Sequence, residues 1–450
     1  MGTGETMAEL SKDMLIEMEI VGFTAEGAGV GRYQGMAVFV PGALPGETVA
    51  ARVVAIRKNF TLARMVKLIK AHPGRIKPPC PTFEHCGGCN LQHTNYLNQL
   101  GLKTAIVREA LRRIGKIETE VKPTLGAESP YHYRNRMGYH VAREGDSFKL
   151  GFFVRQSKRF IEAEDCMLAA TSIQKLAMCL PRSLGGHAAG LEGLRDVVVR
   201  CNSDESVLLL TLVADKPLQA GTSLAADLMA AEPRLKSVWE CAGQPVYGIY
   251  GEQWRLLQGE KFFPDTLCGR QLLLSPATFI QVNPAQTQIL YQLVCDYAAL
   301  TGSESVLDLY CGAGIISLCL ADQAAQVIGV ENYPPAVENA ERNAELNDAA
   351  NCRFICGAAE RILPELAADG VKADVAVLDP PRAGCDTAVL YTLCALGPAK
   401  IIYVSCDPAT LARDMRILCE GGFVTTAVQP VDMFPQTGHV ETVVLLEKEC

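Results

Sequence analysis

A cysteine stands at the junction of a predicted strand and a predicted helix in the segment IIYVSCDPATLARD, residues 401–414. An apolar run ends just before Cys406, and Asp407 followed by Pro408 is a typical helix start. A thiol at this place would lie near the positive end of the helix dipole, which favours the thiolate. This position makes Cys406 a candidate nucleophile. The alternative is a small buried structural cysteine, since the chain contains 18 cysteines.

A second segment, SVLDLYCGAGIISLCLA at residues 305–321, is typical of a buried strand, a glycine turn and a helix. Gly312 and Gly314 would let the backbone turn tightly and approach a ligand. Glu331 ends the next predicted strand, where a carboxylate can accept hydrogen bonds from ribose hydroxyls. A dinucleotide-binding turn would have a third glycine where this chain has Ser317. The pattern therefore suits S-adenosylmethionine, which has a ribose and no pyrophosphate, better than NAD.

A third predicted strand ends in VAVLDPPRAG, residues 375–384. The Asp-Pro-Pro sequence that begins at Asp379 puts a carboxylate and a rigid pair of prolines at the carboxyl edge of a sheet, where open α/β sheets bind ligands. Taken alone, this motif also fits an ordinary turn. However, the glycine turn, Glu331, Asp379 and Cys406 all follow the carboxyl ends of successive predicted strands. Together they predict one ligand-binding site.

Another group of cysteines occurs in CPTFEHCGGCNLQH, residues 80–93. Cys80, Cys86 and Cys89 have the spacing C-x5-C-x2-C, and Cys166 follows far downstream. Four thiolates can hold either zinc or an iron–sulfur cluster. Structural zinc sites usually show two short C-x2-C pairs, whereas here three cysteines lie together and the fourth is remote. The spacing therefore favours a cubane iron–sulfur cluster over zinc.

The elements that would position these residues fall into distinct stretches of the chain. Residues 14–70 contain short alternating segments separated by glycine turns, which predicts a small β-barrel. Residues 126–272 are rich in strand patterns, and from about residue 275 strands and helices alternate, as in a parallel α/β sheet. A helix is expected over roughly residues 96–117, with apolar residues at Leu97, Leu100, Ile106, Leu111 and Ile114.

Two segments are candidates for contact with RNA. The last third of the predicted barrel is rich in arginine and lysine, which fits an RNA-binding surface and a solvated strand face equally well. The segment YHYRNRMGY at residues 131–139 mixes aromatic residues with Arg134 and Arg136. That mixture suits stacking on bases and contact with phosphates, although an exposed edge strand explains it as well.

The composition indicates a soluble globular protein with large cores. The 450 residues are 49% hydrophobic and 20% charged, enough for roughly three domains. The net charge of −8 argues against indiscriminate binding of nucleic acids and leaves a specific RNA partner open. No apolar run is long enough to cross a membrane, and the N-terminus has no apolar signal core. With its many thiols, the chain is therefore expected in the reducing cytoplasm.

Four segments resemble the RNA uracil-5-methyltransferase family: DLYCGAG, LDPPRAG, YVSCDPATLARD and PVDMFPQTGHVETVVLLEK. The N-terminal barrel and the cysteine segment are similar to the 23S ribosomal RNA branch, which has a TRAM domain and a 4Fe–4S cluster. The resemblance covers nearly the whole chain. It implies a Rossmann-like methyltransferase domain, preceded by an OB-like TRAM barrel and a β-rich central domain that carries the cluster.

We expect domain boundaries that follow this resemblance. They are a barrel that binds RNA at 10–72, a central domain at 73–272 and a catalytic domain at 273–450. The helical segment 93–124 belongs to the central part of the chain and is expected to pack on the catalytic domain.

The resemblance also implies roles for individual residues. The contacts to S-adenosylmethionine would come, besides the two glycines, from Gln281, Tyr310, Glu331 and Asp379. Cys406 matches the family nucleophile and Glu441 matches the general base, with His439 as a competing base or a positioning residue. The four cysteines named above would hold a 4Fe–4S cluster. Since the cluster lies far from Cys406 in sequence, we expect it to shape an RNA-binding domain and not to transfer electrons to the methyl reaction.

The implied reaction is methylation of carbon 5 of a specific uridine in 23S ribosomal RNA. Addition of a thiolate to carbon 6 makes carbon 5 nucleophilic, and a carboxylate then removes the proton from carbon 5. We expect a monomer that binds 23S ribosomal RNA and no membrane. One alternative is a transfer-RNA uracil-5-methyltransferase, which by family pattern lacks the barrel and the cysteine cluster. Another is a ribosome-assembly factor without turnover, against which Cys406 and Glu441 argue.

Overall fold

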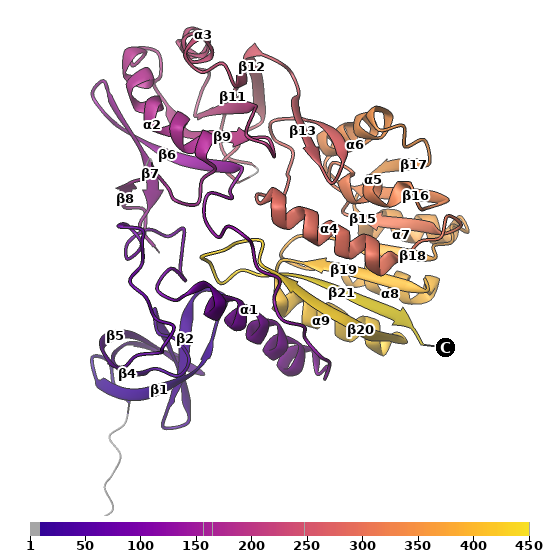
Figure 1. Ribbon diagram of the computed structural model, residues 1–450, viewed down its shortest axis with the longest axis horizontal. Coiled ribbons are helices and arrows are strands. Elements are labelled where there is room, and N and C mark those ends of the chain that lie inside the picture. The colour runs from indigo at the N-terminus through magenta and orange to yellow at the C-terminus, as the bar shows by residue number, and fades with distance from the viewer. Residues whose placement is uncertain (1–9, 156, 164, 247, 450) are drawn as a thin grey trace, which may run out of the picture.

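The structure, a computed structural model, describes residues 10–449 except 156, 164 and 247. Residues 1–9, part of the segment that predicts an unexported chain, lie outside this description. Figure 1 shows a barrel at the N-terminal end, a central sheet and a C-terminal sheet, with helix α1 (Tyr96–Ala110) between the barrel and the C-terminal sheet. Among the described residues, none of the helices combines the length and apolar character that a membrane span requires.

The N-terminal barrel that the sequence predicts is present, and the structure shows it to be closed and five-stranded. Its strands alternate between buried and exposed side chains, so that Ile16, Met18 and Ile20 of the first strand point into the barrel. Neighbouring strands follow the order β1-β2-β3-β5-β4, and β3 pairs with β5 in parallel. The strands are β1 (Leu15–Phe23), β2 (Ala28–Tyr33), β3 (Met36–Pro41), β4 (Thr48–Ile56) and β5 (Phe60–Lys70).

The central sheet has seven strands in the order β12-β11-β10-β9-β6-β7-β8. Its middle strand, β10, is buried throughout, and α2 and α3 pack on the sheet in one hydrophobic core. Its elements are β6 (Arg136–Glu144), β7 (Ser147–Phe153), β8 (Phe160–Glu162), α2 (Thr171–Gly186), β9 (Leu194–Cys201), β10 (Leu208–Ala214), α3 (Gly221–Ala231), β11 (Leu235–Ala242) and β12 (Gln253–Gly259). A hairpin of β13 (Phe263–Leu267) and β14 (Arg270–Leu274) follows.

The C-terminal sheet has the order β17-β16-β15-β18-β19-β21-β20. The strands β15 to β19 pair in parallel, whereas β21 runs antiparallel to both β19 and β20. The strands are β15 (Ser305–Leu309), β16 (Gln326–Glu331), β17 (Cys352–Cys356), β18 (Val375–Leu378), β19 (Lys400–Ser405), β20 (Phe423–Val431) and β21 (Glu441–Lys448). This is the α/β fold that the sequence predicts.

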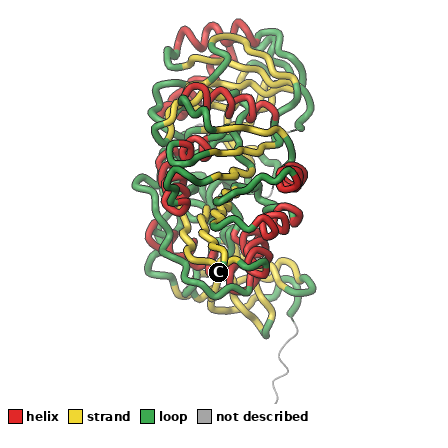
Figure 2. The backbone as a smooth tube through the Cα atoms, turned by 90° about the vertical axis from the view of Figure 1, so that its right-hand side faces the viewer, coloured by secondary structure: helices red, strands yellow, loops and turns green. Residues whose placement is uncertain are grey.

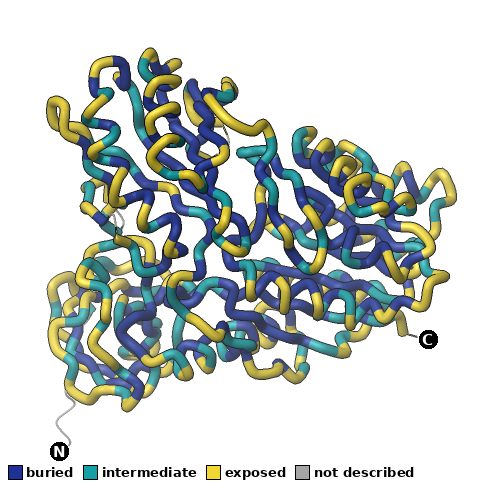
Figure 3. The backbone as a smooth tube through the Cα atoms, turned by 45° about the horizontal axis from the view of Figure 1, so that its top comes forward, coloured by how far each residue is buried: buried dark blue, intermediate teal, exposed yellow. Residues whose placement is uncertain are grey.

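Helices cover both faces of the C-terminal sheet (Figure 2). Residues of α4, α5 and α6 enter the core on one face, and residues of α1, α7, α8 and α9 enter the core on the other. The helices are α4 (Pro284–Ala298), α5 (Ile315–Ala321), α6 (Pro334–Leu346), α7 (Ala359–Ala368), α8 (Thr387–Leu396) and α9 (Pro408–Glu420). Figure 3 shows buried segments running through the interior of the molecule, with exposed segments at its margins. Because helices bury both faces of the C-terminal sheet, the residues at its carboxyl edge are held in fixed positions.

Helix α1 is shorter than expected and buries a different face. The α-helix ends at Ala110, and a π-helical turn, η1 (Leu111–Gly115), follows it. Leu97, one of the expected apolar residues, is 81% exposed, whereas Gln99 and Lys103 are buried. The apolar pattern correctly includes Leu111, which is buried, but it misses Gln99 and Lys103, which are buried because they bond to a loop from the distant C-terminus. We call residues 432–439, which join β20 to β21, the 432–439 loop.

An ion pair between α1 and the 432–439 loop is completely buried. The ammonium of Lys103 contacts the carboxylate of Asp432 and donates to the carbonyl of Phe434 at 3.0 Å. The hydroxyl of Tyr96 donates to the other oxygen of Asp432 at 2.7 Å. Burial lowers the pKa of Lys103, and the charge of Asp432 opposes this effect. Removal of either charge would leave the other one buried without a counter-ion, which is strongly destabilising.

The variant Lys103→Met should therefore lose about 3–5 kcal/mol of unfolding free energy, because the carboxylate of Asp432 remains buried without its counter-ion. Urea unfolding followed by circular dichroism measures this loss. Lys122→Met is the matched control, since Lys122 is exposed and its replacement should change the free energy by less than about 0.5 kcal/mol. A loss of under 1 kcal/mol in Lys103→Met would contradict the role given to the ion pair.

Candidate active site

A cavity of about 640 Å³ opens at the carboxyl edge of the C-terminal sheet. Residues that follow β15, β16, β18 and β19 line it, together with residues 278–282 and the last part of the 432–439 loop. The predicted site residues that line this cavity are Gln281, Tyr310, Gly312, Glu331, Asp379, Cys406 and Glu441, with His439 beside them. Gly314 is not among the lining residues. Segments far apart in the sequence thus meet at one place.

The thiol of Cys406 and the carboxyl of Glu441 lie at adjacent strand ends. In the antiparallel pair of β19 and β21, Ser405 is opposite Thr442. Cys406 follows Ser405 and Glu441 precedes Thr442, so the register brings the two residues side by side at the cavity. Glu441 is only 2% exposed, and its Oε2 has no hydrogen-bond partner among the described residues. That oxygen is available to accept a proton.

Burial raises the pKa values of both the thiol and the carboxyl. Burial, followed by the charge of Asp379, raises the pKa of Glu441 to about 8. Burial, followed by the charge of Glu441, raises the pKa of the Cys406 thiol to about 12. The guanidinium of Arg382 acts in the opposite direction on both pKa values. The site therefore favours the neutral forms of these groups until a further positive charge approaches.

The expected stabilisation of the thiolate by the helix dipole is wrong. Asp407 caps α9 by accepting hydrogen bonds from the amides of Ala409 at 2.9 Å and Thr410 at 3.0 Å. Its carboxylate places a negative charge beside the helix start, and this charge contributes to the raised pKa of Cys406. Burial outweighs any stabilisation of the thiolate by the helix start, and the charge of Asp407 adds a small effect in the same direction as burial.

Glu331 fixes the glycine turn at the cavity. Its Oε2 accepts from the amide of Gly312 at 3.1 Å, and its Oε1 accepts from the amide of Tyr333 at 2.8 Å. Gly314 has a different function, because its φ is +79° and a Cβ there would lie 2.9 Å from Ala340. Gly314 thus allows α5 to begin against α6, while Gly312 lines the cavity.

Ser317, which stands where a dinucleotide-binding turn would have a glycine, bonds inside the fold. Its hydroxyl donates to Asp308 at 2.5 Å and so ties α5 to β15. Burial raises the pKa of Asp308 to about 7, and burial raises the pKa of Asp379 to the same value. Sequence reasoning missed Asp308 because its position inside a strand looks purely structural.

Further lining residues include the two arginines that the sequence offered as candidates for RNA contact, together with Arg382 and Phe279, to which it assigned no role. Arg134, Arg136 and Arg382 bring positive charge to the cavity. The segment of aromatic residues and arginines around Arg134 was the signal for the first two, and Arg382 directly follows the Asp-Pro-Pro motif. Phe279 also lines the cavity and is 69% exposed, which is unusual for an aromatic ring and suits stacking on a base.

The four cysteines of the predicted cluster line a second cavity, of about 400 Å³. Cys80, Cys86 and Cys89 belong to residues 80–92, which we call the cysteine loop, and Cys166 follows β8. All four are free thiols. Within the described part of the chain, no group of three or more His, Cys, Asp or Glu side chains converges closely enough to hold a metal ion.

The two cavities are neighbours in space, although their cysteines are far apart in the sequence. Arg134, Arg136 and Val282 line both of them. Distance in the sequence is therefore no guide to distance in space here, and the expected role of the cysteine loop in shaping an RNA-binding domain stays a prediction.

Comparison with known proteins places the chain in a family. The family model described as tRNA (Uracil-5-)-methyltransferase matches residues 268–449, and the TRAM domain model matches residues 15–66. An uncharacterized RNA methyltransferase of Halalkalibacterium halodurans is 41% identical over 98% of each chain. One of Listeria innocua is 39% identical over 97% of this chain and 98% of its own.

A solved structure extends the likeness to the whole fold. The Pyrococcus abyssi tRNA (uracil-54, C5)-methyltransferase in complex with S-adenosyl-L-homocysteine has a TM-score of 0.73 and 25% sequence identity. The match covers 96% of this chain and 100% of that chain. The chain thus belongs to the RNA uracil-5-methyltransferase family with a TRAM domain, whose reaction depends on S-adenosylmethionine.

Proposed function

We propose that the protein methylates carbon 5 of a uridine in 23S ribosomal RNA, with Cys406 as nucleophile and Glu441 as general base. The observation that carries this proposal is the placement of the thiol and the buried carboxyl at adjacent strand ends of one cavity. The choice of 23S ribosomal RNA rests on the resemblance of the barrel and the cysteine segment to that branch of the family.

The chemistry requires a thiolate and a base in this order. Cys406 adds through its sulfur to carbon 6 of the uracil, and the electron pair of the carbon 5–carbon 6 double bond becomes available at carbon 5. That electron pair would form a bond from carbon 5 to the methyl carbon of S-adenosylmethionine while the methyl–sulfur bond breaks, and the sulfur keeps its electron pair in the leaving S-adenosylhomocysteine. Glu441 takes the proton from carbon 5, the double bond re-forms, and the carbon–sulfur bond to Cys406 breaks. The target base must be extruded from its RNA stack to reach the thiol.

The charges of the cavity suit these two substrates. Glu331, Asp379 and Glu441 provide carboxyl groups for a cavity that receives a sulfonium cation and ribose hydroxyls. We assign Gln281, Tyr310, Gly312, Glu331 and Asp379 to the binding of S-adenosylmethionine. Its positive charge beside Cys406 would lower the pKa of the thiol, as Arg382 already does. Arg134 and Arg136 are suited to RNA phosphates.

We propose that Cys80, Cys86, Cys89 and Cys166 hold a 4Fe–4S cluster. Burial, together with the charges of the three other thiols, raises the pKa of Cys89 to about 12, so the four cannot ionise together without a bound cation. The ligands of a cubane bind different irons and need not converge on one point, whereas the ligands of a single zinc ion must. When bound, the cluster would supply a rigid cross-link between the cysteine loop and the residues after β8. No step of the methyl transfer needs it.

A transfer RNA is the second candidate substrate, and one observation favours it. The Pyrococcus abyssi transfer-RNA enzyme matches 96% of this chain, which leaves too few residues unmatched to contain the barrel. The expectation that a barrel separates ribosomal-RNA enzymes from transfer-RNA enzymes is therefore wrong. The four cysteines and the resemblance of their segment remain the argument for ribosomal RNA.

The substrate is tested by mapping 5-methyluridine in cells with and without the gene. We expect one or more 5-methyluridines of 23S ribosomal RNA to be lost on deletion and restored by the wild-type protein. The matched control is complementation with Cys406→Ala, which should restore none. Loss of 5-methyluridine from transfer RNA alone would contradict the ribosomal assignment and support the second candidate.

The roles of the two catalytic residues predict different failures. Cys406→Ala should abolish methyl transfer without any covalent RNA adduct, because the first bond cannot form. Glu441→Gln should transfer the methyl group and then stall as a protein–RNA adduct, because the proton on carbon 5 has no acceptor. A denaturing gel with labelled RNA and labelled methyl donor should show a slow band with both labels only for Glu441→Gln.

Two controls frame this experiment. RNA that contains 5-fluorouridine should trap the wild-type enzyme in the same band, and Cys179→Ala, which removes an exposed thiol, should behave as wild type.

In the wild type, release of the adduct should become faster as the pH rises through about 8, because only ionised Glu441 accepts the proton. Near wild-type turnover of Glu441→Gln would make His439 the next candidate base.

The cluster predicts a metal content. Protein purified without oxygen should contain about four irons per chain. Cys86→Ser should lose the iron and its visible absorbance, whereas Cys179→Ser should keep both. Stoichiometric zinc without iron would contradict the cluster.

A further inference from the structure

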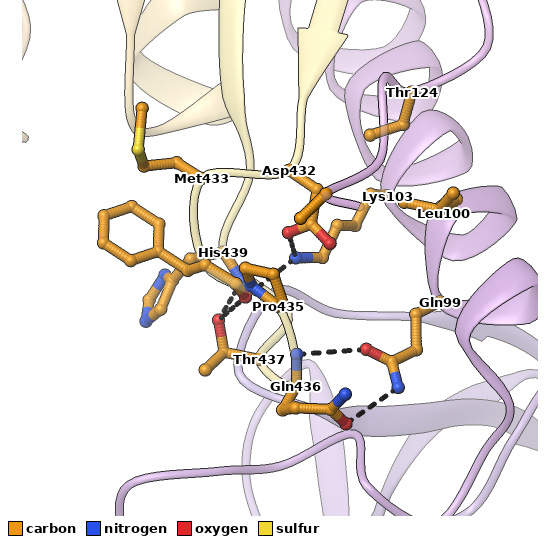
Figure 4. A network of polar contacts seen from close by, with 12 residues as sticks. Gln99, Leu100, Lys103, Thr124, Asp432, Met433, Pro435, Gln436, Thr437 and His439 are labelled. Atoms are coloured by element: carbon orange, nitrogen blue, oxygen red, sulfur yellow. Dashed lines mark hydrogen bonds and ion pairs between the residues drawn. The ribbon is translucent and has the colours of Figure 1, made fainter. Parts of the chain in front are cut away.

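The 432–439 loop ends with His439 and leads through Val440 into Glu441, the first residue of β21. Strand pairing sets the register of Glu441, and the loop contributes to the direction in which Glu441 and His439 point. Figure 4 shows that side chains of α1 reach across to this loop and bond to it. Gln99 and Lys103 supply these contacts from a part of the chain that lies more than 300 residues earlier in the sequence. The loop that carries the proposed base into position is thus held from outside the C-terminal sheet.

Gln436 lies at the centre of the loop in a conformation that needs support. Its φ is +70°, in the left-handed region that non-glycine residues rarely adopt. Its amide donates to Gln99 Oε1 at 3.1 Å, and its side-chain oxygen accepts from Gln99 Nε2 at 3.0 Å. Its carbonyl accepts from the amides of Asn90 at 3.1 Å and Leu91 at 3.0 Å. Both backbone groups and the side chain of Gln436 are therefore fixed.

The cysteine loop and the barrel meet the same loop two residues further on. The amide of Gly438 donates to Asn90 Oδ1 at 2.8 Å, and Asn90 directly follows Cys89. A Cβ on Gly438 would lie 2.2 Å from the carbonyl oxygen of Ala25, which belongs to the turn between β1 and β2. Only glycine fits between these two contacts, so the loop is enclosed beside His439.

We propose that Asn90 and Gln99 are positioning residues that hold the 432–439 loop and thereby orient Glu441 for proton removal. The cysteine loop then acts on catalysis through Asn90, by geometry, in addition to any contact with RNA. This inference rests on the proposed function, because it concerns the proton-removal step of that reaction. A misplacement of about 1 Å is enough to slow a catalytic step up to 100-fold.

The test compares Asn90→Ala and Gln99→Ala with the wild type. Each variant should lower kcat about 10- to 100-fold, while kcat/KM for RNA should change by less than about twofold because the affected step follows methyl transfer. Each should accumulate the slow gel band with labelled RNA and labelled methyl, because methyl transfer proceeds and proton removal lags. The double variant should be no slower than about the slower single variant, since both contacts hold one loop.

Two matched variants separate positioning from loss of structure. Asn90→Asp keeps the oxygen that accepts from Gly438 and should retain near wild-type kcat. Asn98→Ala removes a side-chain amide from α1, the helix that carries Gln99; this amide donates to Thr94 at 2.8 Å, and its loss should leave kcat and the adduct unchanged. The thermal midpoint and the affinity for S-adenosylmethionine are measured for all variants.

The outcomes are distinct. Wild-type kcat in both alanine variants, or a loss of activity through weaker RNA binding without accumulated adduct, would overturn the positioning role. A failure of the proposed function would appear in the wild type and in Asn98→Ala, which would then form neither product nor adduct. An alanine variant that unfolds is replaced by Gln99→Met, and the same adduct readout decides.

Discussion

The site depends on the register between two strands that run in opposite directions. In a purely parallel sheet, the strand next to β19 would present its carboxyl end beside Cys406. Because β21 is antiparallel to β19, its first residue, Glu441, takes that place instead. A shift of this register by one residue would turn the carboxyl to the other face of the sheet. The long pairing of β21 with both β19 and β20 fixes the register and hence the distance between thiol and base.

Burial of the carboxyl groups at this site changes their pKa values. Three carboxyl groups, on Asp308, Asp379 and Glu441, have raised pKa values because they are desolvated in the same region. A cation that enters the cavity would be attracted by them and would in turn stabilise their charged forms and the thiolate. The arrangement therefore links the binding of a positively charged methyl donor to the ionisation of the groups that act on the base.

Much of this site could be predicted from the sequence, because parallel strands converge at their carboxyl ends. Glu331, Asp379 and Cys406 each follow a predicted strand, and the fold places all three at one cavity. The acidity of Cys406 could not be predicted, since it depends on burial and on Glu441, a neighbour only in space. The buried face of α1 was also hidden, because Gln99 and Lys103 read as surface residues until their partners in the C-terminal loop are known.

The close approach of Gly438 to Ala25 has a consequence for how such enzymes can change over evolution. The barrel is a separate fold, yet its first turn forms part of the enclosure around a loop of the C-terminal unit. Asn90 meets the same turn, since a Cβ on Gly27 would lie 2.7 Å from it. The three parts of the chain are therefore not interchangeable modules. A lineage that exchanged or lost the barrel would have to rebuild the 432–439 loop at the same time, so the pieces are constrained to diverge together.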